Sequence, residues 1–398
     1  MKNEKVLKKQ EMLFSVIVTL FWFGQYVYIP YQIIYLSEKS INEYAIGIIV
    51  GVYGLSQLLC RFPIGIVANT ISKHKNFIIL GCFLSALASI FRITLESKVG
   101  FFIGNIFSGL ASTTWISFMI FYLNKYDEER QQSATSKIVM LNNIGMLLGF
   151  IVSTVLYYEI GMRNICILSI LSGIIACLFS FYLFEDENIK VEISFKKIII
   201  VCGNRRLWIL AIFALVQQGI QMTTTMSFTN KILQQLSASS FVIGISSIIY
   251  MGASVLFSKL GSTSLIRKKS PKFWISFIFL ILAIYTILVS NVNKVSYILI
   301  LQLLPGMGTG ILFAFLTSEA LKEIEKTQKT VGMGLYQAIY ALGMTMFPII
   351  FGNIIENYGI RIGYNILGII SFIMSILGLV CYTFIFDIKK RKNNIENC

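Results

Sequence analysis

Twelve long apolar windows divide this chain of 398 residues, and they restrict its fold more than any other feature. A helix that crosses a bilayer needs about 20 mostly apolar residues. The windows cover residues 12–36, 44–68, 76–95, 100–123, 134–158, 162–184, 207–229, 240–262, 273–290, 296–319, 331–355 and 363–386. Only 13% of the residues are charged, whereas soluble domains carry about a quarter. We therefore predict an all-α polytopic membrane protein with twelve transmembrane helices.

Lysine and arginine accumulate in alternate connections between these windows. The two terminal segments and every second connection hold 26 of the 34 basic residues. The remaining connections hold Lys39, Arg92, Lys98, Arg163, Lys231, Lys294 and Arg361. Because cytoplasmic loops retain basic residues, we expect both termini in the cytoplasm and a multi-pass protein of the plasma membrane. This distribution accounts for the net charge of +15 without a nucleic acid, so the lipid bilayer is the expected partner.

The chain contains a weak internal repeat with an offset of about half its length. Ile46-Gly47-Ile48 and Tyr53 correspond to Ile243-Gly244-Ile245 and Tyr250 at an offset of 197, and Gly145, Gly161 and Arg163 correspond to Gly343, Gly359 and Arg361 at an offset of 198. In transporters, such repeats place the substrate site between two related halves near the middle of the membrane. We therefore predict two pseudo-symmetric six-helix halves, residues 1–184 and 207–398, joined by a cytoplasmic loop at 185–206.

The joining loop changes in composition along its length. It begins with Glu185-Asp186-Glu187 and continues through Phe195-Lys196-Lys197-Ile198-Ile199-Ile200. The second part has the composition of a short amphipathic helix on the inner membrane surface. An ordinary linker is the alternative.

A turn motif lies between the second and third windows. It consists of Arg61, Pro63, Gly65, Asn69, Ser72, Lys73 and Lys75. This spacing resembles the loop motif of the major facilitator superfamily, and together with twelve helices in two related halves the resemblance extends over essentially the whole chain. The family usually has Asp where Asn69 stands and Gly where Ser72 stands. The resemblance implies a role in gating for these residues.

The substitution at Asn69 changes what the turn can do. An Asp at this position would accept hydrogen bonds from a helix N-terminus and face its positive dipole end. Asn69 keeps the hydrogen-bond acceptor but loses the charge. If the turn stabilises one conformation, it should therefore do so more weakly. The alternative is that the turn only sets topology and packing.

Two groups of glycines suggest mechanical roles. Gly145 and Gly149 lie in the 134–158 window and are similar to a glycine-rich motif of exporters in the same superfamily, with Phe150 where that motif usually has Pro. Physically, their spacing indicates only close helix packing. In the 296–319 window, Pro305, Gly306, Gly308 and Gly310 predict a flexible or kinked helix. We favour a conformational hinge over a packing kink.

Ionisable groups are almost absent from the windows. None carries an Asp, Glu, His or Lys near its centre, although such groups usually form proton relays in membranes. Whether transport is coupled to an ion therefore stays undecided, and the windows show no central carboxylate that could carry protons. Arg61 is the one embedded charge that we identify, and it either extends to the interface or pairs with an edge carboxylate during gating. The seven cysteines lie in windows or on the reducing side, and His74 is the single histidine. We expect no cofactor, no metal site and no catalytic residue.

Neutral polar and aromatic residues form stripes on windows that the resemblance places around a central cavity. The predicted cavity residues are Trp22, Gln25, Tyr28 and Gln32 in the first window, Ser112 and Trp115 in the fourth, and Gln217 and Gln221 in the seventh, with Tyr336 and Tyr340 in the eleventh as weaker candidates for the wall or a gate. A glutamine facing lipid would leave unsatisfied polar groups, so these stripes should face inward. Polar contacts between helices are the alternative for any single stripe.

Such a cavity suits a small solute that is neutral, amphipathic, or cationic and aromatic. Aromatic faces hold organic cations, and glutamines bond hydroxyls or amides, whereas an anionic solute would require cavity arginines. We predict a monomeric transporter, not an enzyme, that works by rocker-switch alternating access. Export is favoured by the Gly145 and Gly149 pattern and by the aromatic lining of the predicted cavity. An uptake permease for a neutral metabolite such as a sugar or nucleoside is the alternative, and a membrane-embedded transferase is a distant one.

Overall fold

The computed structural model describes residues 4–71, 73–126, 128–184, 195–261, 270–325 and 328–381, and within these ranges the chain is helical without a strand. Eleven of the described helices are long and apolar enough to cross a membrane. One of them, Lys137–Ser180, is two helices that meet at Gly161, where φ is 72° and the backbone leaves the helical conformation. Each of the twelve apolar windows therefore corresponds to one crossing, and the predicted fold class is confirmed.

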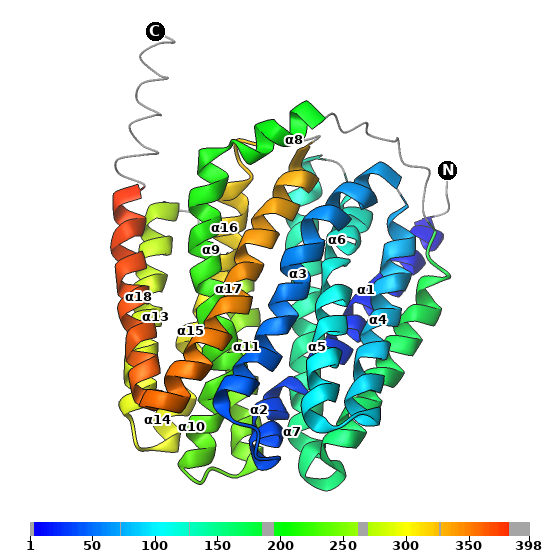
Figure 1. Ribbon diagram of the computed structural model, residues 1–398. Coiled ribbons are helices and arrows are strands. Elements are labelled where there is room, and N and C mark those ends of the chain that lie inside the picture. The colour runs from blue at the N-terminus through cyan, green and yellow to red at the C-terminus, as the bar shows by residue number, and fades with distance from the viewer. Residues whose placement is uncertain are drawn as a thin grey trace.

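The helices form an antiparallel bundle (Figure 1). The first part of the chain contains α1 (Glu4–Tyr26), α2 (Ile29–Glu38), α3 (Glu43–Ile71), α4 (His74–Thr94), α5 (Ser97–Thr113), α6 (Trp115–Leu123) and α7 (Glu128–Ser180). After α8 (Phe195–Cys202), the second part contains α9 (Arg205–Thr223), η1 (Thr224–Phe228), α10 (Thr229–Gln235), α11 (Ser240–Gly261), α13 (Pro271–Asn291), α14 (Val295–Leu301), α15 (Leu303–Met307), η2 (Gly308–Leu312), α16 (Phe313–Ala320), α17 (Lys329–Tyr358) and α18 (Ile360–Cys381). We call the end that carries α8 and the start of α1 the terminal end.

Four crossings are interrupted, namely α1–α2, α5–α6, α9–α10 and α14–α16. Residues that weaken the helical hydrogen-bond pattern lie at these points. Pro30 lacks a donor at the start of α2, and Thr114 turns its hydroxyl to the carbonyl of Ala111 at 2.8 Å. Thr224 does the same to Ile220 at 2.7 Å in the π-helical turn η1. Side-chain bonds of this kind, like proline, bend or break helices.

The two parts of the chain make matching contacts at the offset seen in the sequence. Asn105 Nδ2 donates to the carbonyl of Ile49 at 2.7 Å. Gln302 Nε2 donates to Ser246 Oγ at 2.8 Å, and both of these residues lie 197 positions after the first pair. The division at 185–206 remains a prediction, and its acidic start lies outside the described residues. The helix expected in its second part is present as α8.

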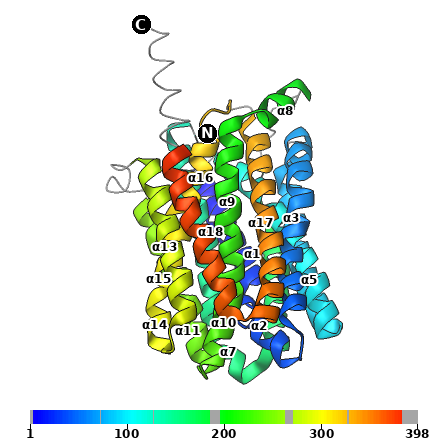
Figure 2. The ribbon, with the colours of Figure 1, turned by 60° about the vertical axis from the view of Figure 1, so that its left-hand side comes forward.

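The longest contact between the two parts runs along α3 and α17, which lie side by side in both views (Figure 2). Glycines on α3 allow the backbones to approach closely. A Cβ on Gly51 would lie 2.6 Å from the carbonyl oxygen of Thr345, and one on Gly54 would lie 2.6 Å from its nitrogen. Small residues serve this purpose at helix interfaces in membranes, where apolar burial between helices provides little driving force.

Candidate functional site

A small cavity lies between the two parts of the chain, beside the interruptions of the first and seventh crossings. It is lined by Gln25, Tyr26, Tyr28, Ile29, Gln32, Val50, Tyr53, Asn105, Met222 and Met226. The last two come from α9 and η1, Tyr28 lies in the turn between α1 and α2, and the others come from α1, α2, α3 and α5. The space within it is about 20 Å³, which holds about one water molecule. In this conformation, the cavity is therefore too small for an organic solute.

Three of the residues predicted on the first window line this cavity. Gln25 is 2% exposed, yet neither atom of its amide has a hydrogen-bond partner among the residues that the structure describes. The amide oxygen of Gln32 is also buried, and none of the described residues bonds to it. Tyr28 lies between them on the same face. An unpaired buried polar group costs roughly 1–3 kcal/mol, so these amides are suited to a ligand that supplies the missing bonds.

The other predicted cavity residues lie around the cavity rather than on its wall. Trp22 packs edge-on against Trp115, with ring centroids 5.2 Å apart. Ser112 contacts the cavity residue Tyr53 through a 2.9 Å hydroxyl bond.

In the second part, Gln217 donates to Gln221 at 3.2 Å, and Gln221 donates to Tyr250 at 2.8 Å. Tyr336 is fully buried and accepts from Thr317 at 3.4 Å. Their contribution to substrate binding remains a proposal.

A buried arginine, Arg92, lies directly behind the cavity wall. Our sequence prediction placed it in a connection and named Arg61 as the one embedded charge, and both statements are wrong. Arg92 is 5% exposed and donates to Tyr28 at 2.8 Å and to Asn105 at 2.9 Å. Side chains point back toward the N-terminus of their helix, so a residue near the C-terminal end of α4 is aimed into the bundle. Gly104 provides the space, since a Cβ there would lie 2.7 Å from Arg92 Cγ.

Arg61 joins the two parts of the chain on the terminal side of the cavity. Its guanidinium donates to Gln337 and Tyr340 on α17 and to Gln57 on its own helix. It lies 5.0 Å from the centroid of the Tyr340 ring. At 4% exposure, it does not extend to the interface, and its acceptors are neutral rather than carboxylates. In this conformation, Arg61 therefore forms a contact between the halves, and its role in gating remains a proposal.

The other end of the bundle is closed by charged and polar contacts. Glu43 on α3 forms an ion pair with Lys231 on α10. Glu356 on α17 accepts from Asn42 Nδ2 at 3.1 Å and from the backbone nitrogen of Tyr44 at 2.9 Å. Contacts between the two parts therefore exist on both sides of the cavity.

Comparison with known proteins identifies the architecture. The model of the Major Facilitator Superfamily matches residues 14–327. The chain belongs to this superfamily. An uncharacterised transporter of Buchnera aphidicola (subspecies Acyrthosiphon pisum) is 27% identical over 195 residues, which cover 47% of this chain and 49%, about half, of that relative. An uncharacterised transporter of Methanocaldococcus jannaschii is 23% identical over 368 residues, covering 87% and 92%.

Solved structures share the fold over nearly the whole chain. A mutant form of the nucleoside transporter NupG has a TM-score of 0.76 at 17% identity, covering 94% of this chain and all of that one. NupG without the mutation has a TM-score of 0.71 at 15% identity and covers 94% and 99%. This likeness concerns the fold, and it agrees with an integral membrane protein of the Major Facilitator Superfamily.

The superfamily turn motif is formed as a tight connection between α3, which ends at Ile71, and α4, which begins at His74. Pro63 is an exposed residue within α3, and Gly65 is buried. Lys73 is exposed immediately before α4. The side chain of Asn69 and the whole of Ser72 lie outside the described residues, so the weaker stabilisation expected from Asn69 remains a prediction.

The glycines expected from exporters of the superfamily pack against α1. A Cβ on Gly145 would lie 2.5 Å from the carbonyl oxygen of Thr19, and one on Gly149 would lie 3.1 Å from the nitrogen of Val27. Close packing therefore accounts for both positions without a role in export.

The predicted hinge falls where the tenth crossing is irregular. Pro305 and Gly306 lie in the five-residue α15, and Gly308 begins the π-helical turn η2. Gly306 also contacts α11 closely, since a Cβ there would lie 2.8 Å from the carbonyl oxygen of Tyr250. The irregular helix agrees with the predicted kink, and its movement remains a proposal. Among the described residues, no group of His, Cys, Asp or Glu is placed to hold a metal ion.

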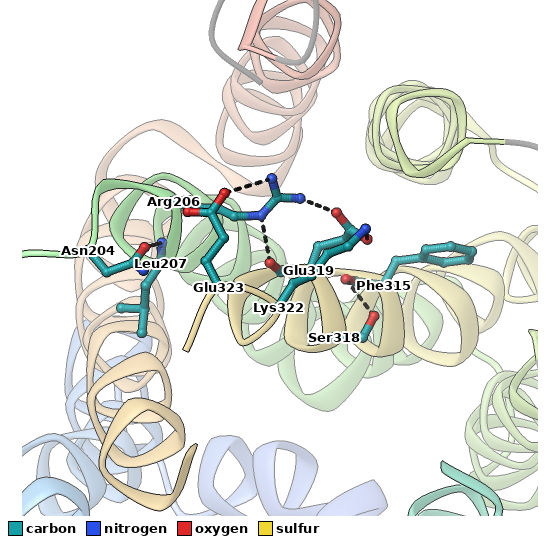
Figure 3. Close-up of polar contacts among 8 residues, drawn as sticks. All are labelled: Asn204, Arg206, Leu207, Phe315, Ser318, Glu319, Lys322 and Glu323. Carbon is teal, nitrogen blue, oxygen red and sulfur yellow. Dashed lines mark hydrogen bonds and ion pairs between the residues drawn. The ribbon is translucent and has the colours of Figure 1, made fainter. Parts of the chain in front are cut away.

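An ion-pair cluster ties the seventh crossing to the tenth at the terminal end (Figure 3). Arg206 on α9 pairs with Glu319 on α16 and also donates Nε to the Glu319 carbonyl at 2.8 Å. Its Nη1 lies 3.6 Å from Glu323. In the first part, Glu11 on α1 accepts from Tyr122 on α6 at 3.0 Å. The two contacts are equivalent in the repeat, because Arg206 lies 195 positions after Glu11 and Glu319 lies 197 positions after Tyr122.

Replacing Glu319 with glutamine should destabilise the protein by about 2–4 kcal/mol, because the largely buried Arg206 would lose its closest carboxylate. The Glu319 and Arg206 side chains are both 11% exposed. Glu323→Gln is the matched control: this carboxylate faces the same arginine but is 41% exposed, so its loss should cost at most about 0.5–1 kcal/mol. Thermal melting of the purified variants in detergent compares them. Equal decreases in Tm for the two variants would contradict the larger contribution of the Arg206–Glu319 pair to stability.

Proposed function

We propose that this facilitator takes up a small neutral solute rich in hydrogen-bonding groups, of the nucleoside or sugar class, by alternating access between its two halves. The observation that carries the proposal is the buried amide of Gln25, which has no hydrogen-bond partner among the described residues and lines the cavity between the halves. Hydroxyls and carbonyls of such a solute would complete the bonds that Gln25 and Gln32 lack. The contacts of Arg61 on one side and Glu43 on the other would then break alternately.

Two observations favour this alternative over the export of amphipathic or cationic compounds. Packing against α1 explains the Gly145 and Gly149 pattern, so this pattern no longer favours export over uptake. The charge of Arg92 behind the cavity wall opposes a cationic solute. NupG is described as a nucleoside transporter, which agrees with a solute of the nucleoside class. The likeness to NupG concerns the fold, and the proposed solute class rests on the cavity.

Gln25→Leu should separate binding from folding. The leucine keeps the volume of the side chain and removes an amide that has no partner in the protein, so the Tm should stay the same or rise. Uptake of labelled uridine or glucose into proteoliposomes, whichever the unaltered protein transports, should fall about tenfold because the solute loses its hydrogen bonds. Outward transport from preloaded vesicles, measured beside uptake, tests the direction.

Gln235→Leu serves as the control, because Gln235 is exposed on α10 and should affect neither quantity. Loss of folded protein together with transport in Gln25→Leu would mean that the amide is structural. If neither solute is transported in any direction, the proposed class is wrong.

A further inference from the structure

The charge of Arg92 has no counter-ion among the residues that the structure describes. Its guanidinium donates to Ser89 at 2.9 Å, Tyr28 at 2.8 Å, Asn105 at 2.9 Å and Ser108 at 2.7 Å, and each of these groups is neutral. It also lies 3.9 Å from the centroid of the Tyr28 ring. A buried charge held only by neutral dipoles keeps most of its field. Because Tyr28 and Asn105 line the cavity, that field reaches the solute.

The hydrogen bonds around Arg92 determine which way its neighbours donate. Its Nη2 carries two hydrogens and faces three oxygens, those of Tyr28, Asn105 and Ser108. The amide of Asn105 is fixed, since its nitrogen donates to Ile49. The oxygen of Tyr28 accepts from the arginine, so its hydrogen must be donated elsewhere. Within the protein, Ser108 is its partner only at 3.4 Å, which is long for a bond between hydroxyls. Tyr28 also lines the cavity, so an oxygen of a bound solute is the alternative acceptor for this hydrogen.

The second half lacks this charge. The residue 197 positions after Arg92 is Val289, which is fully buried. On that side, the cavity is bounded by Met222 and Met226, whose thioethers pack well against flat rings. The two walls of the cavity therefore differ: one offers a donor backed by a positive charge, and the other is apolar.

We infer that Arg92 makes the cavity selective for solutes that present an acceptor oxygen to Tyr28 and carry no positive charge. This inference rests on the proposed function, because it names the recognised group of the same solute. The acceptor is a carbonyl or hydroxyl oxygen directed toward Tyr28, and the apolar face of the solute lies against Met222 and Met226. Arg92 acts through Tyr28 and Asn105, so it is a positioning residue that sets specificity.

The test compares two probes on the purified full-length protein in lipid nanodiscs by calorimetry. Uridine is neutral and presents carbonyl oxygens, whereas tetraphenylphosphonium is an aromatic cation. The unaltered protein should bind uridine at least about a hundredfold more tightly than the cation. In Arg92→Gln, this ratio should fall at least about tenfold, because the field that excludes cations is gone. A purely structural role would weaken both probes together and leave the ratio unchanged.

Two further variants keep the inference testable if Arg92→Gln does not fold. Tyr28→Phe retains the ring over the guanidinium and removes the donor, so uridine binding should weaken about tenfold while the cation stays excluded. Arg92→Lys keeps the charge and should keep the exclusion of the cation. Arg163→Gln removes an exposed arginine of α7 and should change neither affinity.

The outcomes separate this inference from the proposed function. If the unaltered protein binds uridine but binds the cation equally well, or if Arg92→Gln and Tyr28→Phe both leave the two affinities unchanged, the role of Arg92 is refuted and the proposed function stands. If uridine and glucose both fail to bind to the unaltered protein, the proposed solute class is refuted, and the inference falls with it.

Discussion

Transport should fall by about 30- to 700-fold when Arg61 is replaced by methionine. Arg61 donates to Gln337 and Tyr340 across the contact between α3 and α17, and the same guanidinium holds Gln57. Methionine fills the space but leaves these oxygens without a donor. Hydrogen bonds to charged groups contribute about 1.5–3 kcal/mol each and are not additive, so we expect the state closed at the terminal end to lose about 2–4 kcal/mol relative to the open one.

The structure offers a reporter for this change. Gly334 on α17 faces Arg61, and a Cβ there would lie 3.6 Å from the Arg61 carbonyl oxygen, an ordinary contact that tolerates Gly334→Cys. Alkylation of this cysteine by a water-soluble maleimide, followed by mass spectrometry, measures how often the terminal end opens. Labelling should rise in Arg61→Met in proportion to the loss of transport. Arg61→Lys keeps the charge but loses the planar guanidinium, so both its labelling and its transport should lie between those of the unaltered protein and Arg61→Met.

Normal transport in Arg61→Met, with slow labelling, would show that Arg61 is only a structural residue in the wall. Loss of transport without increased labelling would place its effect elsewhere than in closure of the terminal end.

The crossings of this fold were predictable because each one is a local property of the sequence. A helix in lipid must be long, apolar and internally hydrogen-bonded, so residues 76–95 predict α4 (His74–Thr94) without knowledge of any neighbour. The interruption at Pro305 was also visible, since proline and glycine act on their own helix. The break at Thr114 was not predicted, because a threonine bends a helix only when its hydroxyl turns to the backbone.

The site was predictable only where a single helix supplies it. Gln25, Tyr28 and Gln32 share a face by their spacing, and all three line the cavity. Arg92 was misplaced because counting charges by connection treats a residue near a helix end as exposed. Its burial depends on Gly104 of the next helix. That glycine was the available signal, but its meaning depends on the packing of two helices.

The contacts that close the two ends could not be predicted from the sequence, because they also depend on how separate helices pack together. Asn42 and Glu356 are 314 residues apart, and neither carries a local pattern that names the other. Only the packing of α3 against α17 brings them together.

Reversing the charge of Lys231 should open the end opposite the termini and reduce transport about tenfold or more. Lys231 on α10 pairs with Glu43 on α3, and their side chains are 13% and 25% exposed. Lys231→Glu replaces this attraction with repulsion between two carboxylates. At the intermediate dielectric of such a position, the difference amounts to about 2–4 kcal/mol against the closed state. Transport in proteoliposomes and spin-label distances between α3 and α10 measure the two effects.

The exchanged pair provides the decisive comparison. Glu43→Lys combined with Lys231→Glu restores the attraction with reversed polarity, so the distance between α3 and α10 should return and most of the transport with it. Lys98→Glu controls for the change in net charge, because Lys98 is exposed at the same end on α5 and should leave both measurements unchanged. If the double variant is no better than Lys231→Glu alone, the ion pair does not close this end. The polar contacts of Glu356 would then hold the halves together without it, and the two ends would differ in kind: a cation bound by neutral groups on one side, and a carboxylate bound by neutral groups on the other.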